Sequence, residues 1–246
     1  MLIALLSDIH GNREALTACL EHGRSAGVDR YVFLGDYVGY GADPGFVVDA
    51  IQAQVAQGAL AVRGNHDEAI ETGTNRMNAS AARAIVWTRR QLSEAQRAFL
   101  RTLPISESEA DRLYVHANVD APAAWGYVTD LYSASRSLIA LRAHIAFCGH
   151  VHVPALYHMS PTGKIAGVDP VGGIEIPLSQ HQRWLAVLGA VGQPRDGNPA
   201  ACYAIFDDAR DVLTYVRVPY DLDSAAQKIR AAGLPTRLAD RLYDGS

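Results

Sequence analysis

The sequence of residues 2–12 reads LIALLSDIHGN. Leu2 to Leu6 form a short apolar run, which is typical of a buried strand, and polar Asp8 and His10 follow it closely. The next residues, Arg13 to Ser25, place apolar side chains at helical spacing. A buried strand that ends in polar residues and leads into a helix indicates a unit of an α/β fold.

The same arrangement recurs through the first two thirds of the chain. Further strand-like runs lie at residues 30–34, 60–62, 112–115 and 144–148, and helical patterns lie at residues 44–51, 77–101 and 131–141. We expect Ser93 to divide the 77–101 pattern into two helices, because serine caps helix N-termini well. Strands that alternate with helices predict an α/β layer architecture.

The last third has a different pattern. Residues 155–218 are rich in Gly, Pro, Val and Ile, and we expect them to form a second, more antiparallel sheet with strands at 203–206 and 213–218. Residues 224–242 are again helical, with a break at Gly233 and Pro235. We therefore predict a single domain over residues 1–246, made of a motif-bearing α/β part (1–154) and a part with the second sheet and the C-terminal helices (155–246).

Composition narrows the class of protein. The chain has 246 residues, of which 49% are hydrophobic and 20% are charged, with a formal net charge of −4. That charge disfavours a nucleic-acid substrate, which needs positive charge to neutralise phosphates. The three cysteines form no C-x-x-C pair, and no apolar run approaches the roughly 20 residues of a membrane span. We expect a cytoplasmic protein that does not enter a membrane.

The residues that could bind a metal or take part in a reaction lie in five short polar segments. Most of these segments follow a predicted strand. They are Asp8-Ile9-His10, Gly35-Asp36, Gly64-Asn65-His66-Asp67, His116 and Gly149-His150-Val151-His152. In open α/β sheets, ligands collect beyond the carboxyl ends of the strands. We therefore expect these segments to meet at one rim.

The residue types indicate a metal site. Carboxylates and imidazoles are good ligands for Mn, Fe and Zn. Asp-x-His and His-x-His place two side chains on one face of an extended chain, so each pair could hold one ion. The neighbouring glycines permit tight turns and close approach of the backbone to a ligand.

Together, these segments resemble the calcineurin-like metallophosphoesterase superfamily, in its bacterial phosphoesterase and phosphodiesterase branch. The pattern of that family is D-x-H, then G-D, then G-N-H-[DE], then a lone His, then G-H-x-H, and all of its blocks are present between residues 8 and 152. The resemblance implies two mixed β-sheets packed face to face and flanked by helices, a four-layer α/β/β/α sandwich.

The resemblance also implies how the ligands divide. Asp8, His10 and His152 would hold the first metal ion. Asn65, His116 and His150 would hold the second, and Asp36 would bridge both. His66 would face the phosphate as a catalytic residue and stabilise or protonate the leaving oxygen.

The implied activity is hydrolysis of a small or nucleotide-like phosphoester. Two divalent or trivalent ions, Mn or Fe in preference to Zn, would hold a hydroxide that attacks phosphorus in line. Dinucleoside polyphosphate hydrolysis and Ser/Thr phosphoprotein phosphatase activity are the enzymatic alternatives. A catalytically silent metal-binding scaffold is the alternative from another class, although the complete ligand set weighs against it.

One block departs from the protein phosphatases. They carry G-D-x-x-D-R-G, where the second Asp orients the catalytic His and the Arg grips the phosphate. This chain has Gly39 and Tyr40 at those two places, which puts a protein-phosphatase assignment in doubt. Asp67 is a candidate to orient His66 instead.

Substrate contacts are predicted at Asn12, Arg13, Asn65 and Arg195. Asn12 and Arg13 begin the first helix, a place suited to anions, although Asn12 could equally serve only as the helix cap. Arg195 lies in the Gly- and Pro-containing segment 188–198, which could form a wall of the cleft or simply join two strands.

Overall fold

The computed structural model describes residues 1–75 and 77–246. Two six-stranded mixed sheets form its centre. The first has the order β3-β2-β1-β11-β12-β9 and the second has the order β4-β5-β6-β10-β7-β8. The strands are β1 (Leu2–Leu6), β2 (Arg30–Phe33), β3 (Leu60–Ala61), β4 (Ser106–Glu109), β5 (Arg112–Val115), β6 (Ile145–Cys148), β7 (Pro154–Met159), β8 (Ile165–Val168), β9 (Glu175–Pro177), β10 (Arg183–Leu188), β11 (Ala201–Asp207) and β12 (Val212–Val218).

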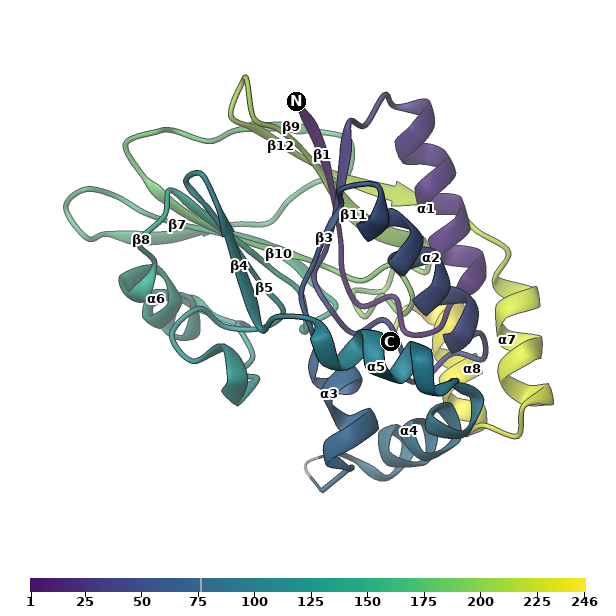
Figure 1. The fold of residues 1–246 in the computed structure, drawn as a ribbon. Helices are drawn as coiled ribbons and strands as arrows, with labels where there is room; N and C mark the ends of the chain where they lie inside the picture. The colour runs from purple at the N-terminus through teal and green to yellow at the C-terminus, as the bar shows by residue number, and fades with distance from the viewer. Residues whose placement is uncertain (76) are drawn as a thin grey trace.

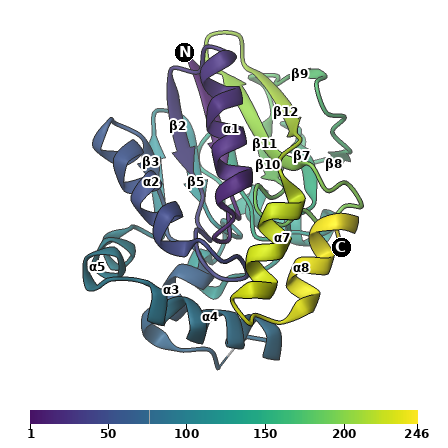
Figure 2. The ribbon, with the colours of Figure 1, turned by 90° about the vertical axis from the view of Figure 1, so that its right-hand side faces the viewer.

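Helices cover the outer faces of both sheets. They are α1 (Arg13–Ser25), α2 (Pro44–Ala56), α3 (Asn65–Thr72), α4 (Ala79–Gln91), α5 (Glu94–Thr102), α6 (Leu131–Ala140), α7 (Leu222–Ala231) and α8 (Thr236–Asp244), with a 3-10 turn at Pro122–Ala124. Figure 1 shows α1 and α2 beside the first sheet and α6 on the far side of the second. In Figure 2, α7 lies next to α1, with α8 beyond it. The predicted α/β/β/α sandwich is confirmed.

Hydrophobic core lies both between the two sheets and between the first sheet and its helices, so both faces of β1 are buried. Ile3 and Leu5 pack with Phe147 of the second sheet. Ala4 and Leu6 face the opposite way, into the cluster that contains residues of α1 and α2. A strand that is buried on both faces reads as a continuous apolar run, which explains why residues 2–6 show no alternation.

Residues 155–218 do not form a sheet of their own, so that expectation is wrong. β7, β8 and β10 pair into one sheet with β5 and β6, whereas β9, β11 and β12 extend the other. β11 runs antiparallel to β1, with Leu5 opposite Ala204. The sequence pattern predicts each strand locally. Which strand it pairs with depends on contacts between segments that are far apart in the sequence, such as β11 with β1 and β10 with β6.

Several helix boundaries follow the sequence signals. Ser93 caps α5 in a capping box with Gln96, so the predicted break is confirmed. α7 and α8 separate at Gly233 and Pro235, as expected. The pattern of the sequence does not predict α3, because eight residues are too few to show a helical period. Within the described residues, no helix combines the length and apolarity that crossing a membrane requires.

Candidate metal centre

The five polar segments converge on one buried cluster at the seam of the two sheets. Asp8 and Asp36 follow β1 and β2 of the first sheet, whereas His116 and His150 follow β5 and β6 of the second. Potential ligand atoms lie within 4.8 Å of one another in three overlapping groups, namely Asp8-His10-His152, His10-Asp36-His66 and Asp36-His116-His150. The predicted convergence at one rim is therefore correct, but two sheets build that rim.

The spacing within the first group suits a shared cation. His10 Nε2 lies 3.1 Å from His152 Nε2, and Asp8 Oδ1 lies 3.3 Å from the same His152 atom. Two ligands that bind one cation at about 2.1 Å, at angles between 90° and 109°, are separated by roughly 3.0–3.4 Å. Both distances fall within that range, whereas His10 Nε2 and Asp8 Oδ1 lie somewhat farther apart, at 3.9 Å.

The second group is built in the same way. His116 Nε2 lies 3.2 Å from His150 Nδ1 and 3.2 Å from Asn65 Oδ1. Asp36 lies between the groups, with its Oδ2 atom 3.4 Å from His116 Nε2 and 3.7 Å from His10 Nε2. This division agrees with the ligand sets that the family resemblance implies.

Backbone carbonyls orient the four histidines of these two sets. The nitrogen that points away from the cluster faces Val38 O at 3.0 Å in His10, Leu34 O at 2.7 Å in His116, Trp125 O at 3.1 Å in His150 and Gln193 O at 2.6 Å in His152. A carbonyl only accepts, so that nitrogen carries a proton, and in the neutral ring the opposite nitrogen presents a lone pair to the cluster. Metal-binding histidines are typically held in this way. Sequence reasoning missed these carbonyls, since every residue has one.

The carboxylates are arranged to leave one oxygen free for a cation. Asp8 Oδ2 accepts a hydrogen bond from the backbone N–H of His150, and Asp36 Oδ1 accepts one from His66 N. Asp8 Oδ1 is buried and has no hydrogen-bond partner among the described residues. A buried carboxylate oxygen without a partner is costly, and a cation shared with His10 and His152 would satisfy it.

The backbone of the cluster is strained, which corrects one sequence expectation. Five of the seven predicted ligands, Asp8, His10, Asp36, His150 and His152, have φ between 50° and 69°. Residues other than glycine rarely adopt this left-handed backbone region, at a cost of about 1–3 kcal/mol each. The D-x-H and H-x-H pairs are therefore not extended. Asp8 and His10 still share a group, but His150 and His152 belong to different groups, so the expectation that they clasp one ion is wrong.

Close packing explains two of the glycines. A Cβ atom on Gly149 would lie 1.9 Å from Ser7 Oγ and 2.4 Å from Asp8 Oδ2. On Gly64 it would lie 2.2 Å from both the backbone nitrogen and Oδ1 of Asp36. Any larger residue would displace a predicted ligand, as expected for glycines beside a bound group.

His66 is part of the cluster but is held differently. Its Nε2 atom lies 4.0 Å from Asp36 Oδ2, and its Nδ1 atom is buried without a hydrogen-bond partner in the described part of the chain. A Cβ atom on Gly39 would lie 2.4 Å from that Nδ1. The imidazole therefore lacks the carbonyl that orients the other four histidines, which fits a role other than metal ligation.

Asp67 does not orient His66, so that hypothesis is wrong. Its carboxylate accepts hydrogen bonds from the backbone N–H groups of Asp36 (2.8 Å), Tyr37 (2.9 Å), Val38 (3.3 Å) and Gly64 (2.9 Å). Asp67 thereby fixes the loop that carries Asp36 and holds it against the start of α3.

We expect Asp67→Ala to lower the free energy of unfolding by about 3 kcal/mol or more. Several buried backbone N–H donors would lose their acceptor, and each unsatisfied buried donor costs about 1–3 kcal/mol. Urea unfolding with chelator present measures the effect without a contribution from metal. Glu71→Gln, which removes a surface ion pair with Arg101, is the control and should cost under about 1 kcal/mol. Equal stability of the two variants would refute the role of Asp67.

Burial and neighbouring charges shift the pKa values of the clustered histidines in different directions. Burial disfavours the charged form of His116, yet the Asp36 carboxylate raises its pKa to about 9. Burial, together with the neighbouring His116, lowers the pKa of His150 to about 3. Burial also lowers the pKa of His66 to about 4. Since metal ligation needs a neutral imidazole, His150 is ready to bind a cation, and His116 must first release its proton.

The predicted substrate contacts fare unequally. Asn12 caps α1 by accepting from Ala15 N, and its amide donates to Gly192 O at 2.9 Å. Of the two roles considered for Asn12, the structure therefore shows the helix cap. Arg13 is exposed, and its guanidinium lies 4.4 Å from the centre of the Phe46 ring. It lines a surface hollow in which none of the neighbouring residues is a predicted metal ligand. Asn65 lies at the cluster, next to His116.

Arg195 approaches the cluster by way of Tyr40. Its guanidinium lies 5.7 Å from the centre of the Tyr40 ring, and that ring packs 4.6 Å from the ring of His66. The 188–198 segment also bonds to the motif loops, since Gly192 N donates to Asp8 O. This segment is therefore part of the site and not merely a connection between strands.

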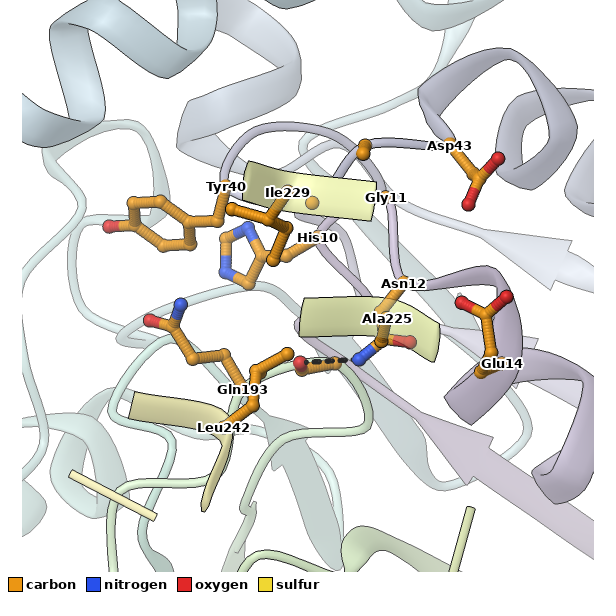
Figure 3. A pocket seen from close by; sticks show the side chains of 13 residues that line it. His10, Gly11, Asn12, Glu14, Tyr40, Asp43, Gln193, Ala225, Ile229 and Leu242 are labelled. Carbon is orange, nitrogen blue, oxygen red and sulfur yellow. Dashed lines mark hydrogen bonds between the residues drawn. The ribbon is translucent and has the colours of Figure 1, made fainter. Parts of the chain in front are cut away.

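The space behind His10 is too small for a substrate. Figure 3 shows it between Tyr40, Gln193 and the helical residues Ala225 and Leu242, with the hydrogen bond from Asn12 to Gly192 crossing it. Its volume is about 10 Å³, enough for about one water molecule. The C-terminal helices close this side of the cluster, so a substrate must enter from elsewhere.

Comparison with known proteins agrees with this geometry. The family model of the calcineurin-like phosphoesterase superfamily domain matches residues 1–211. An uncharacterized protein of Methanocaldococcus jannaschii is 34% identical over 99% of this chain and 98% of its own length. The crystal structure of a metallophosphoesterase from Sphaerobacter thermophilus is 34% identical, with a TM-score of 0.87 and full coverage of both chains. A hypothetical protein from Pyrococcus horikoshii shares the fold at 19% identity, with a TM-score of 0.78, over 100% of this chain and 98% of its own. This chain belongs to the calcineurin-like phosphoesterase superfamily.

Proposed function

We propose that this protein hydrolyses a small phosphoester with the help of two metal ions held by the cluster. The position of Asp36 carries the proposal, since its Oδ2 atom lies between His10 Nε2, at 3.7 Å, and His116 Nε2, at 3.4 Å. A carboxylate between two ligand sets is suited to bridge two cations. Asp, Asn and His donors suit Mn or Fe and also accept Zn.

The residues around the cluster would share the work of the reaction. Bound cations supply Lewis acidity and lower the pKa of a water molecule. Asp8, Asp36 and the carbonyl-oriented histidines keep the positions of those cations fixed. His66 Nε2, which faces no carbonyl among the described residues, is placed to donate a hydrogen bond to the leaving oxygen; burial lowers the pKa of His66 to about 4, so the ring is neutral near pH 7.

Arg195 is proposed to contact the phosphate. Tyr40 stands where the protein phosphatases have an arginine, and the Arg195 guanidinium lies over its ring. A cation from the 188–198 segment could therefore replace the one missing from the second motif. Because Gly39 and Tyr40 replace the Asp and the Arg of the protein-phosphatase motif, we favour a small phosphoester over a phosphoprotein as the substrate.

Turnover of a substrate panel tests the proposal. The panel contains phosphomonoesters, phosphodiesters, dinucleoside polyphosphates, a phosphopeptide and an oligonucleotide, each with Mn added and again after treatment with chelator. We expect metal-dependent hydrolysis of a small ester and no cleavage of the oligonucleotide. Inactivity on every substrate, with metal bound, would favour the silent scaffold.

A further inference from the structure

A second cavity, of about 510 Å³, opens directly on the second ligand set. It lies between α3 and the segment that follows the 3-10 turn, and its walls include Asn65, Glu68, Thr72, Trp125, Tyr127 and His150. Small-molecule sites commonly have volumes of roughly 300–1,000 Å³. Since Asn65 and His150 are predicted metal ligands, a molecule in this cavity would touch the place where the phosphate is proposed to bind.

Two aromatic side chains form the wall beside the predicted ligands. The Tyr127 ring stacks on the ring of His150, with 4.2 Å between centroids and 19° between planes, and 57% of the tyrosine is exposed. The Trp125 ring lies 5.8 Å from the ring of His116. The aromatic faces are therefore next to the cluster and partly open to solvent.

Hydrogen bonds fix this wall in place. The Trp125 indole N–H donates to Glu68 Oε2 at 3.0 Å, which joins the two sides of the cavity. The Trp125 carbonyl accepts from His150 Nε2 at 3.1 Å. Because the same residue orients a predicted metal ligand and lines the cavity, the position of a bound ring is coupled to the position of the second ligand set.

We propose that this cavity binds the nucleoside part of a nucleoside phosphoester whose phosphate lies at the metal cluster. The proposal rests on the proposed function and names its substrate class. Aromatic side chains stack well on the flat faces of bases. Glu68 and Thr72 add polar groups that can hydrogen-bond to the edge of a base or to the sugar.

A pair of substrates with and without a base tests the assignment. The pair is adenosine 5′-monophosphate and glycerol 3-phosphate, or their methyl diesters, whichever form the enzyme hydrolyses. We expect Tyr127→Ala and Trp125→Leu to lower the ratio of kcat/KM for the nucleotide to kcat/KM for the glycerol ester by about 5- to 100-fold, the scale of base stacking. Tyr132→Ala, which truncates a tyrosine on α6 that is 75% exposed and does not line the cavity, should leave the ratio within about twofold. An unchanged ratio in both cavity variants overturns the assignment.

Binding of adenosine gives a readout that needs no turnover. We expect adenosine to quench tryptophan fluorescence saturably in the wild-type protein but not in Trp125→Leu, which keeps Trp87 and Trp184. Absence of saturable quenching in the wild type would also overturn the assignment. If quenching saturates but no ester is hydrolysed, the proposed function fails while the cavity stands as a nucleoside site.

Discussion

Asp36→Asn is expected to abolish binding of both metal ions and to lower turnover at least about 1,000-fold. The loss follows from the position of Asp36 Oδ2 between His10 and His116. Replacing one carboxylate oxygen by an NH2 group removes the negative charge that two cations would share. Metal-ion catalysis contributes several kcal/mol of transition-state stabilisation, and about 1.4 kcal/mol corresponds to a tenfold change in rate.

The substitution is chosen to leave the fold intact. Asp36 Oδ1 accepts a hydrogen bond from His66 N, and asparagine keeps an oxygen for that bond. Metal content after desalting and steady-state turnover measure the two effects. Asp49→Asn, an exposed carboxyl on α2, is the matched control and should retain both metals and full activity. A metal-replete and active Asp36→Asn enzyme would refute the bridging role.

Unlike Asp36→Asn, His66→Ala should lower turnover without releasing metal. We expect both metal ions to remain bound while kcat falls at least about 100-fold, the usual lower range of general acid–base assistance. The physical reason is that His66 lacks the carbonyl partner that orients the other histidines of the cluster, and its Nδ1 atom has no partner among the described residues. Its loss should therefore affect the reaction and not the ligand shell.

Two comparison variants make this result interpretable. His10→Ala should lose metal as well as activity, because His10 belongs to the first ligand set. His181→Ala, an exposed histidine away from the cluster, should change neither. His66 also lies in a group with His10 and Asp36 that could hold an ion. If His66→Ala loses a metal ion in the way that His10→Ala does, His66 is a ligand and the proposed catalytic role is wrong.

The backbone of the cluster adopts angles that its residues disfavour by themselves. Asp8, His10 and Asp36 all have left-handed backbone angles. Interactions elsewhere hold these angles, including the hydrogen bonds from the backbone of Asp36 to Asp67 and from Gly192 N to Asp8 O. The site is therefore maintained by the surrounding structure, and not by the preferences of its own residues.

The sequence alone predicted the chemistry of the site and the class of the fold. Apolar runs that end in Asp and His, separated by helical patterns, are local signals, because residue type and spacing decide them. Ser93 and the break at Gly233 and Pro235 were predictable for the same reason. The meeting of segments within each sheet also followed, since the carboxyl ends of parallel strands lie together, but the packing of the two sheets was needed to join them into one cluster.

Tertiary structure alone decided the rest. The pairing of β11 with β1 and of β10 with β6 placed the last third of the chain in both sheets, and such partners are far apart in sequence. Four histidines are oriented by carbonyls of Leu34, Val38, Trp125 and Gln193, which carry no signature because every residue has the same group. The D-x-H motif of residues 8–10 thus fixed which atoms could bind a metal, whereas packing between distant segments fixed where those atoms point.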